Sequence, residues 1–410
     1  MATGPMLVQP LKELCIRAVS SNFGASPTFG GLPEASCKRV VEGLPLDLPL
    51  ELVGALITDE GYWQRRAAAR WRNCDPAAHG RSWKQLYFER HLQEALERYD
   101  PASDDLNALK RLMAFSHRFA RNVRAAELPS RLDAQVLFDA MGNSPSSLAL
   151  SYGSKALGMD YDRSLAGMQL GDCRCLARAL AHAETLVHLD LSNNALDDDK
   201  ALMLASGLAD NISLTHLDLS HNKIADRGAR TLARVLDASS PLAVLDLSDN
   251  QLHAEGGRAL GRALRASCGL VSLDVRLNRL GDAGVKALLE GLLRPAGGGG
   301  GGGGGGAPLE RLGVAANGAG GGAAAALAAA LRGCRSLARV DASGNPLGLA
   351  AGAALAAAAR ESAGLAALDV RRCGIGGDHE AAIAEELLAR AERRARGGGA
   401  GGGGGGAGLS

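Results

Sequence analysis

The sequence predicts an α/β fold in which a strand–helix unit repeats along a curved solenoid, with an all-helical domain before it. A segment that begins Leu186-Val-His-Leu-Asp-Leu recurs three times at a constant spacing of 28 residues. Each copy follows the pattern L-x-x-L-x-(L/V)-x-x-N-x-(L/I) and leads into a stretch rich in Leu and Ala. All fourteen Phe, Trp and Tyr residues lie within the first 161 positions, which indicates an aromatic core and a separate, repetitive core.

The repeated pattern is the signature of the leucine-rich repeat. In L-x-L, alternate side chains point to one face of a short strand, so both leucines can point inward. The Asn side chain can satisfy backbone groups in the turn, and the rest of the unit returns as a helix. A 28-residue unit with a full helix is typical of the ribonuclease-inhibitor-like class. We therefore expect a leucine-rich repeat horseshoe with strands on its concave side.

We expect seven such units over residues 186–378. Their first residues are Leu186, Leu214, Leu242, Leu270, Leu309, Leu337 and Leu365. The fifth unit starts 39 residues after the fourth, and ten glycines at 297–306 account for nearly all of the excess. We interpret this run as an insertion between a helix and the next strand, where added length costs little.

The two ends of the solenoid need caps, because an open end would expose the core. Residues 146–185 are expected to form an N-terminal cap or degenerate repeat, with candidate strands at 148–152 and 157–161. A capping helix is expected over 379–396, followed by a disordered glycine-rich tail over 397–410.

The residues between the inward leucines are expected to point out on the concave face. The first such position is acidic in every unit but the fifth, which has Gly313. The acidic residues are Asp190, Asp218, Asp246, Asp274, Asp341 and Asp369. The next outward position carries Arg276 and Arg371 among Ser and Ala residues.

Neighbouring strands lie about 4.8 Å apart, so successive carboxylates would form an acidic column whose like charges repel. A basic partner, or water and salt, would relieve that repulsion. We therefore take the six aspartates, Arg276 and Arg371 as candidate partner-binding residues. The alternative is that Leu-Asp-Leu-Ser is simply a common form of this repeat.

Residues 1–145 are expected to form a helical, aromatic-rich domain. Apolar residues at helical spacing predict helices near 10–19, 49–57, 61–71, 82–96 and 106–123. Its candidate partner-binding residues are Trp63, Arg66, Trp71, Arg81 and Trp83. Aromatic and Arg side chains are typical of interface hot spots and would suit an acidic filament or coiled coil. The alternative is that the tryptophans form the core and the arginines a solvated face.

The composition argues against several classes of protein. A formal net charge of +1 gives no global field for nucleic acid or a membrane, and eight scattered cysteines indicate reduced thiols in the cytoplasm. Neither a membrane span nor a signal peptide is expected. The glycine runs lack the ending of a phosphate loop, and no H-E-x-x-H, G-x-S-x-G or Cys/His ligand set occurs. We therefore expect a non-enzymatic binding scaffold without catalytic residues, metal or cofactor.

Motifs outside the generic repeat carry a more specific signal. They are Leu7-Val-Gln-Pro-Leu-Lys-Glu-Leu-Cys-Ile, Leu44-Pro-Leu-Asp-Leu-Pro-Leu, Tyr62-Trp63, Trp71, His79-Gly-Arg-Ser-Trp-Lys-Gln-Leu-Tyr-Phe-Glu-Arg-His-Leu92, Leu150-Ser-Tyr-Gly with Gly158-Met, and Asp197-Asp-Asp-Lys-Ala201. With them the chain resembles the dynein regulatory complex subunit 5 family over roughly residues 7–395, and the block at 79–92 is the most specific part. The Gly/Ala-rich repeats after 295 depart from the family.

The resemblance implies a scaffold subunit of the nexin–dynein regulatory complex of motile cilia and flagella. Such a subunit contributes to the regulation of dynein-driven microtubule sliding. The implied partners are other subunits of the complex, with doublet microtubule or dynein components as further candidates. The implied location is the cytoplasm and cytoskeleton, in the axoneme of the cilium or flagellum.

Two other classes stay open. The stretch from Leu44 to Trp71 also has the look of an F-box, which would make the chain a substrate receptor of a ubiquitin ligase. Binding to the ligase adaptor would distinguish that reading. A GTPase-activating protein for Ran uses the same class of repeat but would need no aromatic head, and a GTP hydrolysis assay would separate it.

Overall fold

The structure, a computed structural model, describes residues 10–100, 103–128, 132, 134–142, 144–153, 167–237, 239–266, 269–293 and 308–398, with side chains described as far as residue 393. By its internal contacts the chain divides into two compact units. The first comprises Met1–Ala125 with Asp139–Pro145, and the second comprises Ala126–Phe138 with Ser146–Ser410. Each unit is described by itself.

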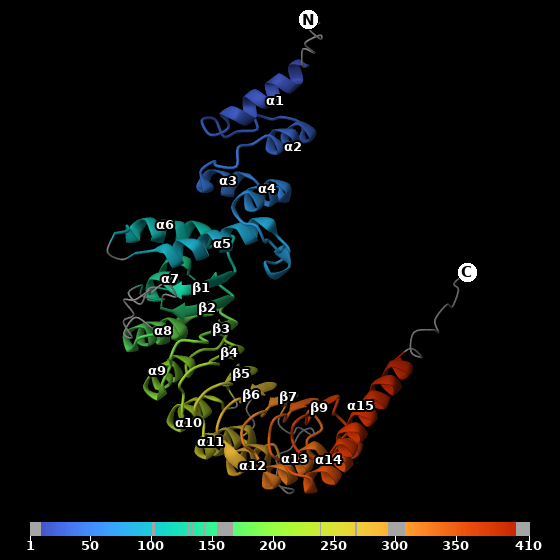
Figure 1. The fold of residues 1–410 in the computed structure, drawn as a ribbon. Helices are drawn as coiled ribbons and strands as arrows, with labels where there is room; N and C mark the ends of the chain where they lie inside the picture. Colours follow the sequence, from blue (N-terminus) through green and yellow to red (C-terminus); the bar gives the residue numbers. More distant parts are fainter. Residues whose placement is uncertain are drawn as a thin grey trace, which may run out of the picture. The chain divides into compact units, whose positions relative to one another are not determined.

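Helices make up most of the first unit (Figure 1). They are α1 (Leu11–Asn22), α2 (Glu34–Glu42), α3 (Leu50–Leu56), α4 (Glu60–Arg70), the 3-10 turn Pro76–Ala78, α5 (Trp83–Arg98) and α6 (Leu106–Ser116). Four of them begin at residues whose side chains cap a free N–H group: Asp59 accepts from Tyr62 at α4, Asp75 from Ala77 at the 3-10 turn, Ser82 from Gln85 at α5, and Asp105 from Asn107 at α6.

Aromatic side chains fill the core of this unit. Trp63, Tyr62 and Phe88 are fully buried, and the Trp63 and Phe88 rings lie 5.4 Å apart in a tilted arrangement. Phe88 also stacks on Phe119 at 4.5 Å. Large rings in such geometries bury much apolar area for few residues, which suits a small domain.

The expected all-helical character and the long helix over 106–123 are wrong at one place. Helix α6 ends at Ser116, and Asn122–Leu128 form a strand, β1, followed by α7 (Ala134–Met141). Val123 and Ala125 are buried whereas Arg124 is exposed, which is the alternation of a strand with one buried face. Burial of every second residue is the pattern of a strand, whereas the buried residues of a helix recur every three or four positions.

Parallel strands and helices alternate in the second unit (Figure 1). The strands from β2 onward are β2 (Ser147–Tyr152), β3 (His188–Asp190), β4 (His216–Asp218), β5 (Val244–Asp246), β6 (Ser272–Asp274), β7 (Arg311–Gly313), β8 (Arg339–Asp341) and β9 (Ala367–Asp369). The helices are α8 (Leu170–His182), α9 (Asp198–Leu208), α10 (Asp226–Val235), α11 (Ala254–Arg265), α12 (Gly281–Gly291), α13 (Gly321–Gly333), α14 (Ala350–Glu361) and α15 (Gly377–Gly398).

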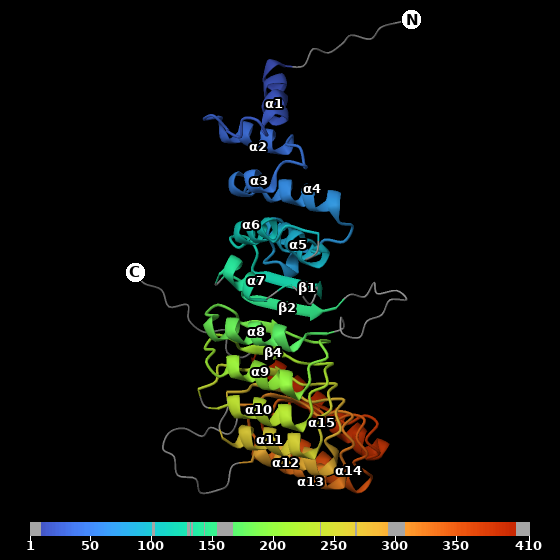
Figure 2. The same ribbon diagram turned by 90° about the vertical axis from the view of Figure 1, so that its left-hand side faces the viewer.

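The strands of this unit pair in sequence order and line one side, while α8–α14 stack in the same order on the other (Figure 2). Equivalent residues pair in register, for example Leu189 with Leu217 and Leu217 with Leu245. Leu189 and Leu191 are fully buried, so the leucines point inward as the repeat pattern predicts. The predicted leucine-rich repeat horseshoe is confirmed in this unit.

The flanks of the repeats follow the same rules. Strand β2 pairs with β3, with Ser147 opposite His188, so 148–152 joins the sheet as a degenerate repeat. At the other end α15 packs on α14, and the Arg390 guanidinium donates to the Ala359 carbonyl at 2.8 Å, satisfying an end of α14. The second candidate strand at 157–161, the polyglycine run at 297–306 and the tail after 398 lie outside the described residues.

Candidate functional site

The concave side of the second unit carries the predicted row of aspartates. Asp190 pairs with Asp218, Asp218 with Asp246, and Asp246 with Asp274 on successive strands. Asp341 and Asp369 continue the row on β8 and β9. The alternation of the sequence therefore placed these side chains on the correct face.

Each aspartate has a partner in its own loop. The carboxylate accepts a hydrogen bond from the backbone N–H two residues later, at 2.8 to 3.1 Å, in all six units. The donors are Ser192, Ser220, Ser248, Arg276, Ser343 and Arg371. This is the local turn bond that Asp side chains commonly make, so the row has a structural role whatever else it binds.

Buried asparagines hold the turns beneath this row. Asn222 accepts from the backbone N–H groups of Asn194 and Leu196 in the preceding unit, at 3.0 and 2.9 Å. Its amide donates to Leu191, also in the preceding unit, and to Leu219 in its own. In the last unit the Cys373 thiol replaces the amide and donates to the Ala342 carbonyl at 3.1 Å. The asparagines thereby join one unit to the next, beyond serving their own turn.

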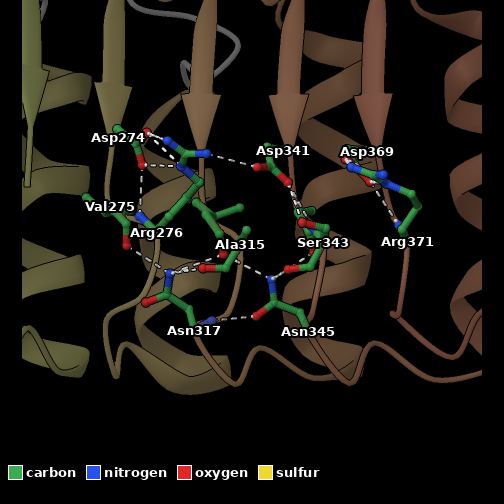
Figure 3. Close-up of polar contacts among 12 residues, drawn as sticks. Asp274, Val275, Arg276, Ala315, Asn317, Asp341, Ser343, Asn345, Asp369 and Arg371 are labelled. Carbon is green, nitrogen blue, oxygen red and sulfur yellow. Dashed lines mark hydrogen bonds and ion pairs between the residues drawn. The ribbon is translucent and has the colours of Figure 1, made fainter. Parts of the chain in front are cut away.

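The gap in the acidic row at Gly313 is where an arginine crosses between strands (Figure 3). The Arg276 guanidinium contacts Asp274 at 2.7 Å and reaches Asp341, two strands away, at 3.5 Å. A Cβ atom at Gly313 would lie 2.6 Å from the Asp274 carboxylate and 3.1 Å from the Arg276 side chain. An aspartate at this position would therefore displace the bridge.

A second arginine neutralises the end of the row. Arg371 contacts the Asp369 carboxylate at 2.5 Å, and the same carboxylate accepts from the Arg371 backbone. That side-chain hydrogen bond holds the pKa of Asp369 below its ordinary value, against the opposing effect of partial burial. The C-terminal aspartates are therefore paired with cations from their own chain.

The middle of the row behaves differently. Burial raises the pKa of Asp246, and the charges of Asp274 and Asp218 on the neighbouring strands raise it further. Hydrogen bonds from Ser248 oppose both effects. Like charges one strand apart therefore disfavour the ionised form of this carboxylate, as expected for an acidic column.

A third outward row precedes the aspartates. Its residues are His188, His216, Val244, Ser272, Arg311, Arg339 and Ala367. They point out for the same reason of alternation, so the signal was present in the sequence. Two exposed arginines therefore stand side by side on β7 and β8, in register with each other.

A hollow of about 600 Å³ opens on the concave face at this end. Its lining includes Arg311, Arg339, the Arg276 bridge with its two aspartates, the Asp369–Arg371 pair, and Glu380, Ile383 and Ala384 of α15. A volume of this size lies in the range of ligand pockets, and it is large enough to receive a few side chains of a partner.

The first unit holds the other predicted residues, and two of them are buried. Trp63 has no exposed surface and donates from Nε1 to the Ile57 carbonyl at 3.0 Å. Arg66 is 7% exposed, donates to the Tyr62 hydroxyl at 3.0 Å, and lies over the Trp63 and Tyr87 rings. These two side chains hold the core together and leave little or no surface for a partner.

The remaining three lie nearer the surface. Trp71 is half-buried, the guanidiniums of Arg70 and Arg90 lie over its ring, and its Nε1 donates to Glu94. Trp83 is half-buried against the aromatic core, and Arg81 is exposed in the turn before α5 with a φ of 60°. The structure therefore does not bring the five residues together as one exposed surface.

The described residues contain no cluster of three or more His, Cys, Asp or Glu side chains arranged to hold a metal ion. Among the described helices, none combines the length and apolar character needed to cross a membrane.

Comparison with known proteins gives both the repeat class and the relatives. A family described as leucine-rich repeat matches residues 182–205, 210–233, 238–261 and 266–289. Dynein regulatory complex subunit 5 of Chlamydomonas reinhardtii is 62% identical over 199 residues, which cover 48% of this chain and 51% of that protein. The subunit of the same name in Mus musculus is 31% identical over 225 residues, covering 48% of this chain and 45% of that protein.

The chain thus spans about half the length of the curated relatives it matches. An internalin from Listeria monocytogenes has 17% identity and a TM-score of 0.37, and the match covers 68% of each chain. The resemblance inferred from the motifs of the sequence is confirmed by the named relatives.

Proposed function

Because the chain is a leucine-rich repeat protein similar over about half its length to dynein regulatory complex subunit 5, we propose that it is an interaction subunit of such a complex. In this function it holds other subunits in the axoneme of a motile cilium or flagellum and contributes to the regulation of dynein-driven sliding. It acts as a scaffold and performs no chemical reaction.

The concave face is the observation that carries the proposal. It presents three outward rows across seven in-register strands, with the aspartates fixed by backbone hydrogen bonds and two arginines fixed by ion pairs. A partner that binds such a surface does not have to order these side chains, which lowers the entropic cost of association.

The alternative function, substrate receptor of a ubiquitin ligase, has less support. Leu44 is buried, and Leu46 and Leu48 pack against the aromatic core of the first unit. The segment that resembles an F-box therefore uses its apolar residues inside its own domain.

Capture of partners from axonemes tests the proposal. The tagged full chain would be incubated with a salt extract of detergent-treated axonemes from Chlamydomonas reinhardtii, the source of the 62% identical relative. We expect recovery of other regulatory complex subunits and no enrichment of a ubiquitin-ligase adaptor. Recovery of the adaptor without any regulatory subunit would replace the proposal with its alternative.

A matched pair of variants locates the surface. Asp190→Asn with Asp218→Asn removes two charges from the concave face and keeps an acceptor for each turn, whereas Arg230→Gln with Arg262→Gln removes two charges from exposed positions on the helical side. We expect only the first pair to reduce capture. If the concave-face pair captures as much as the original chain does, the subunits bind elsewhere on the chain.

A further inference from the structure

The charges at the C-terminal end of the concave face are not evenly satisfied. Asp274 and Asp341 share Arg276, Asp369 pairs with Arg371, and each of these aspartates also accepts a backbone N–H. Within the described part of the chain, neither Arg311 nor Arg339 has a side-chain hydrogen bond, ion pair or ring contact. On the strands of this part of the face the unsatisfied charges are therefore positive, the opposite of what the aspartate row suggests, while Glu380 of α15 supplies a carboxylate at the edge of the hollow.

These two arginines are placed as a pair. Their Cα atoms are partners in the parallel register of the adjacent strands β7 and β8, so they lie about 4.8 Å apart. Both side chains are exposed, and like charges directly opposite each other destabilise a sheet. The residues beside them in the row, Ser272 and Ala367, are small and leave room around the guanidiniums.

We infer that Arg311 and Arg339 bind two carboxylates on a helical segment of a partner subunit, one carboxylate to each guanidinium, at the hollow on the concave face. Glu side chains four residues apart on a helix have Cβ atoms about 5–6 Å apart, which matches the spacing of adjacent strands. Arg binds carboxylates through two parallel hydrogen bonds, so the pair selects planar acidic groups.

The same surface disfavours a nucleic acid or other polyphosphate. Four carboxylates, those of Asp274, Asp341, Asp369 and Glu380, line the hollow with the arginines. A polymer with a charge on every unit would meet these carboxylates as well as the two arginines. A polypeptide with two acidic side chains among neutral ones can place both acids on the arginines and neutral residues beside the carboxylates, so the charge pattern favours a protein segment.

Peptide binding to the full chain tests this inference, which rests on the proposed function only in assigning the segment to a partner subunit. The probe is a fluorescent, alanine-based helical peptide with one pair of Glu residues four apart. We expect salt-sensitive binding that weakens at least about tenfold, or about 1.4 kcal/mol, in Arg311→Glu with Arg339→Glu. A peptide with Gln in place of both Glu residues is expected to bind the original chain as weakly as the Glu peptide binds this variant.

Two controls make the result specific. Arg230→Glu with Arg262→Glu makes the same change of net charge on exposed positions of α10 and α11 and should leave binding unchanged. A peptide with two Lys residues in place of Glu should bind the Arg311→Glu, Arg339→Glu variant more tightly than it binds the original chain. Circular dichroism of each variant checks that the repeats stay folded.

Three outcomes would overturn the inference. They are no binding of the Glu peptide, equal loss in the helical-side variant, and binding of a single-stranded oligonucleotide in preference to the peptide. Failure of the proposed function gives a different result, because Arg-dependent peptide binding would persist while no axonemal subunit is captured. Conversely, the Arg311→Glu, Arg339→Glu variant can be tested for capture of axonemal subunits. Capture equal to that of the original chain would be consistent with the proposed function and would show that these two arginines do not bind a partner subunit.

Discussion

The aspartates of the concave face show what a single residue's place in a pattern reveals. Period-two alternation was enough to put all six on one face, because a strand offers only two faces. It could not reveal their partners. The ion pair between Arg276 and Asp274 depends on the direction in which the Arg276 side chain points. The same guanidinium reaches Asp341 across the intervening strand, where Gly313 has no Cβ atom.

Two aspartates of this row are expected to respond to pH in opposite directions. The raised pKa of Asp246 means that the folded state disfavours the charged form. The contribution of Asp246 to the free energy of unfolding is therefore fully present below its ordinary pKa of 3.8, and it is lost as pH rises through the higher pKa of the folded state. Asp246→Asn, which keeps the acceptor for Ser248, should therefore gain stability relative to the original chain on going from about pH 3 to about pH 7.

Asp369 supplies the matched control. Its lowered pKa means that the charged form is favoured, so its contribution is present above 3.8 and is lost as pH falls through the lower folded value. Asp369→Asn should lose stability at neutral pH, and the loss should shrink in acid. Urea unfolding at both pH values measures each difference, and the same sign for the two variants would contradict the assigned charges.

The buried asparagines give a second prediction at this scale. Asn222→Ala removes two acceptor bonds to the preceding unit and three donor bonds, leaving buried backbone groups unpaired. The expected loss in the free energy of unfolding is about 1–3 kcal/mol. Gln251→Ala, at an exposed position of the next turn, should change it by less than about 0.5 kcal/mol. Equal effects of the two variants would show that the asparagine does not link the units.

At the scale of elements, the sequence predicted strongly periodic segments well and transitions poorly. Helix α5 begins where Ser82 can cap it, and each repeat strand from β3 to β9 lies at the predicted strand position of its unit, where two apolar residues flank an outward one. The change from α6 to β1 was missed because Phe115 and Phe119 continue a helical spacing past Ser116. Only the burial of Val123 and Ala125 around exposed Arg124 separates strand from helix there.

Glycine contacts between helices α11 and α12 make a testable prediction. A Cβ at Gly261 would lie 2.4 Å from the Ala287 carbonyl oxygen, whereas nothing lies within 4 Å of the equivalent atom at Gly171 in α8. Gly261→Ala should therefore destabilise the chain by about 1–3 kcal/mol, because the helices must separate. Gly171→Ala should stabilise it by up to about 1 kcal/mol, since alanine restricts the unfolded chain. Thermal unfolding compares them, and stabilisation by both would contradict the close packing.

For the whole molecule, the separation into an aromatic core and a leucine core was visible in composition alone. The division of the chain was less so, because 126–138 belongs with the repeats whereas 139–145 belongs with the first unit. Contacts between segments far apart in sequence decide such a division, and no local pattern records them. The family resemblance came from the motifs beside the repeats, since the repeat pattern is shared by many unrelated proteins.

We propose that this chain is a structural subunit of an axonemal regulatory complex, and its location in the cell tests that proposal most directly. The tagged full chain would be expressed in Chlamydomonas reinhardtii cells that lack their own subunit 5, and its amount measured in axonemes after detergent removes membrane and soluble protein. We predict that the chain stays with the axonemes and is released together with other regulatory complex subunits by salt. Complete loss of the folded chain into the detergent-soluble fraction would contradict the account.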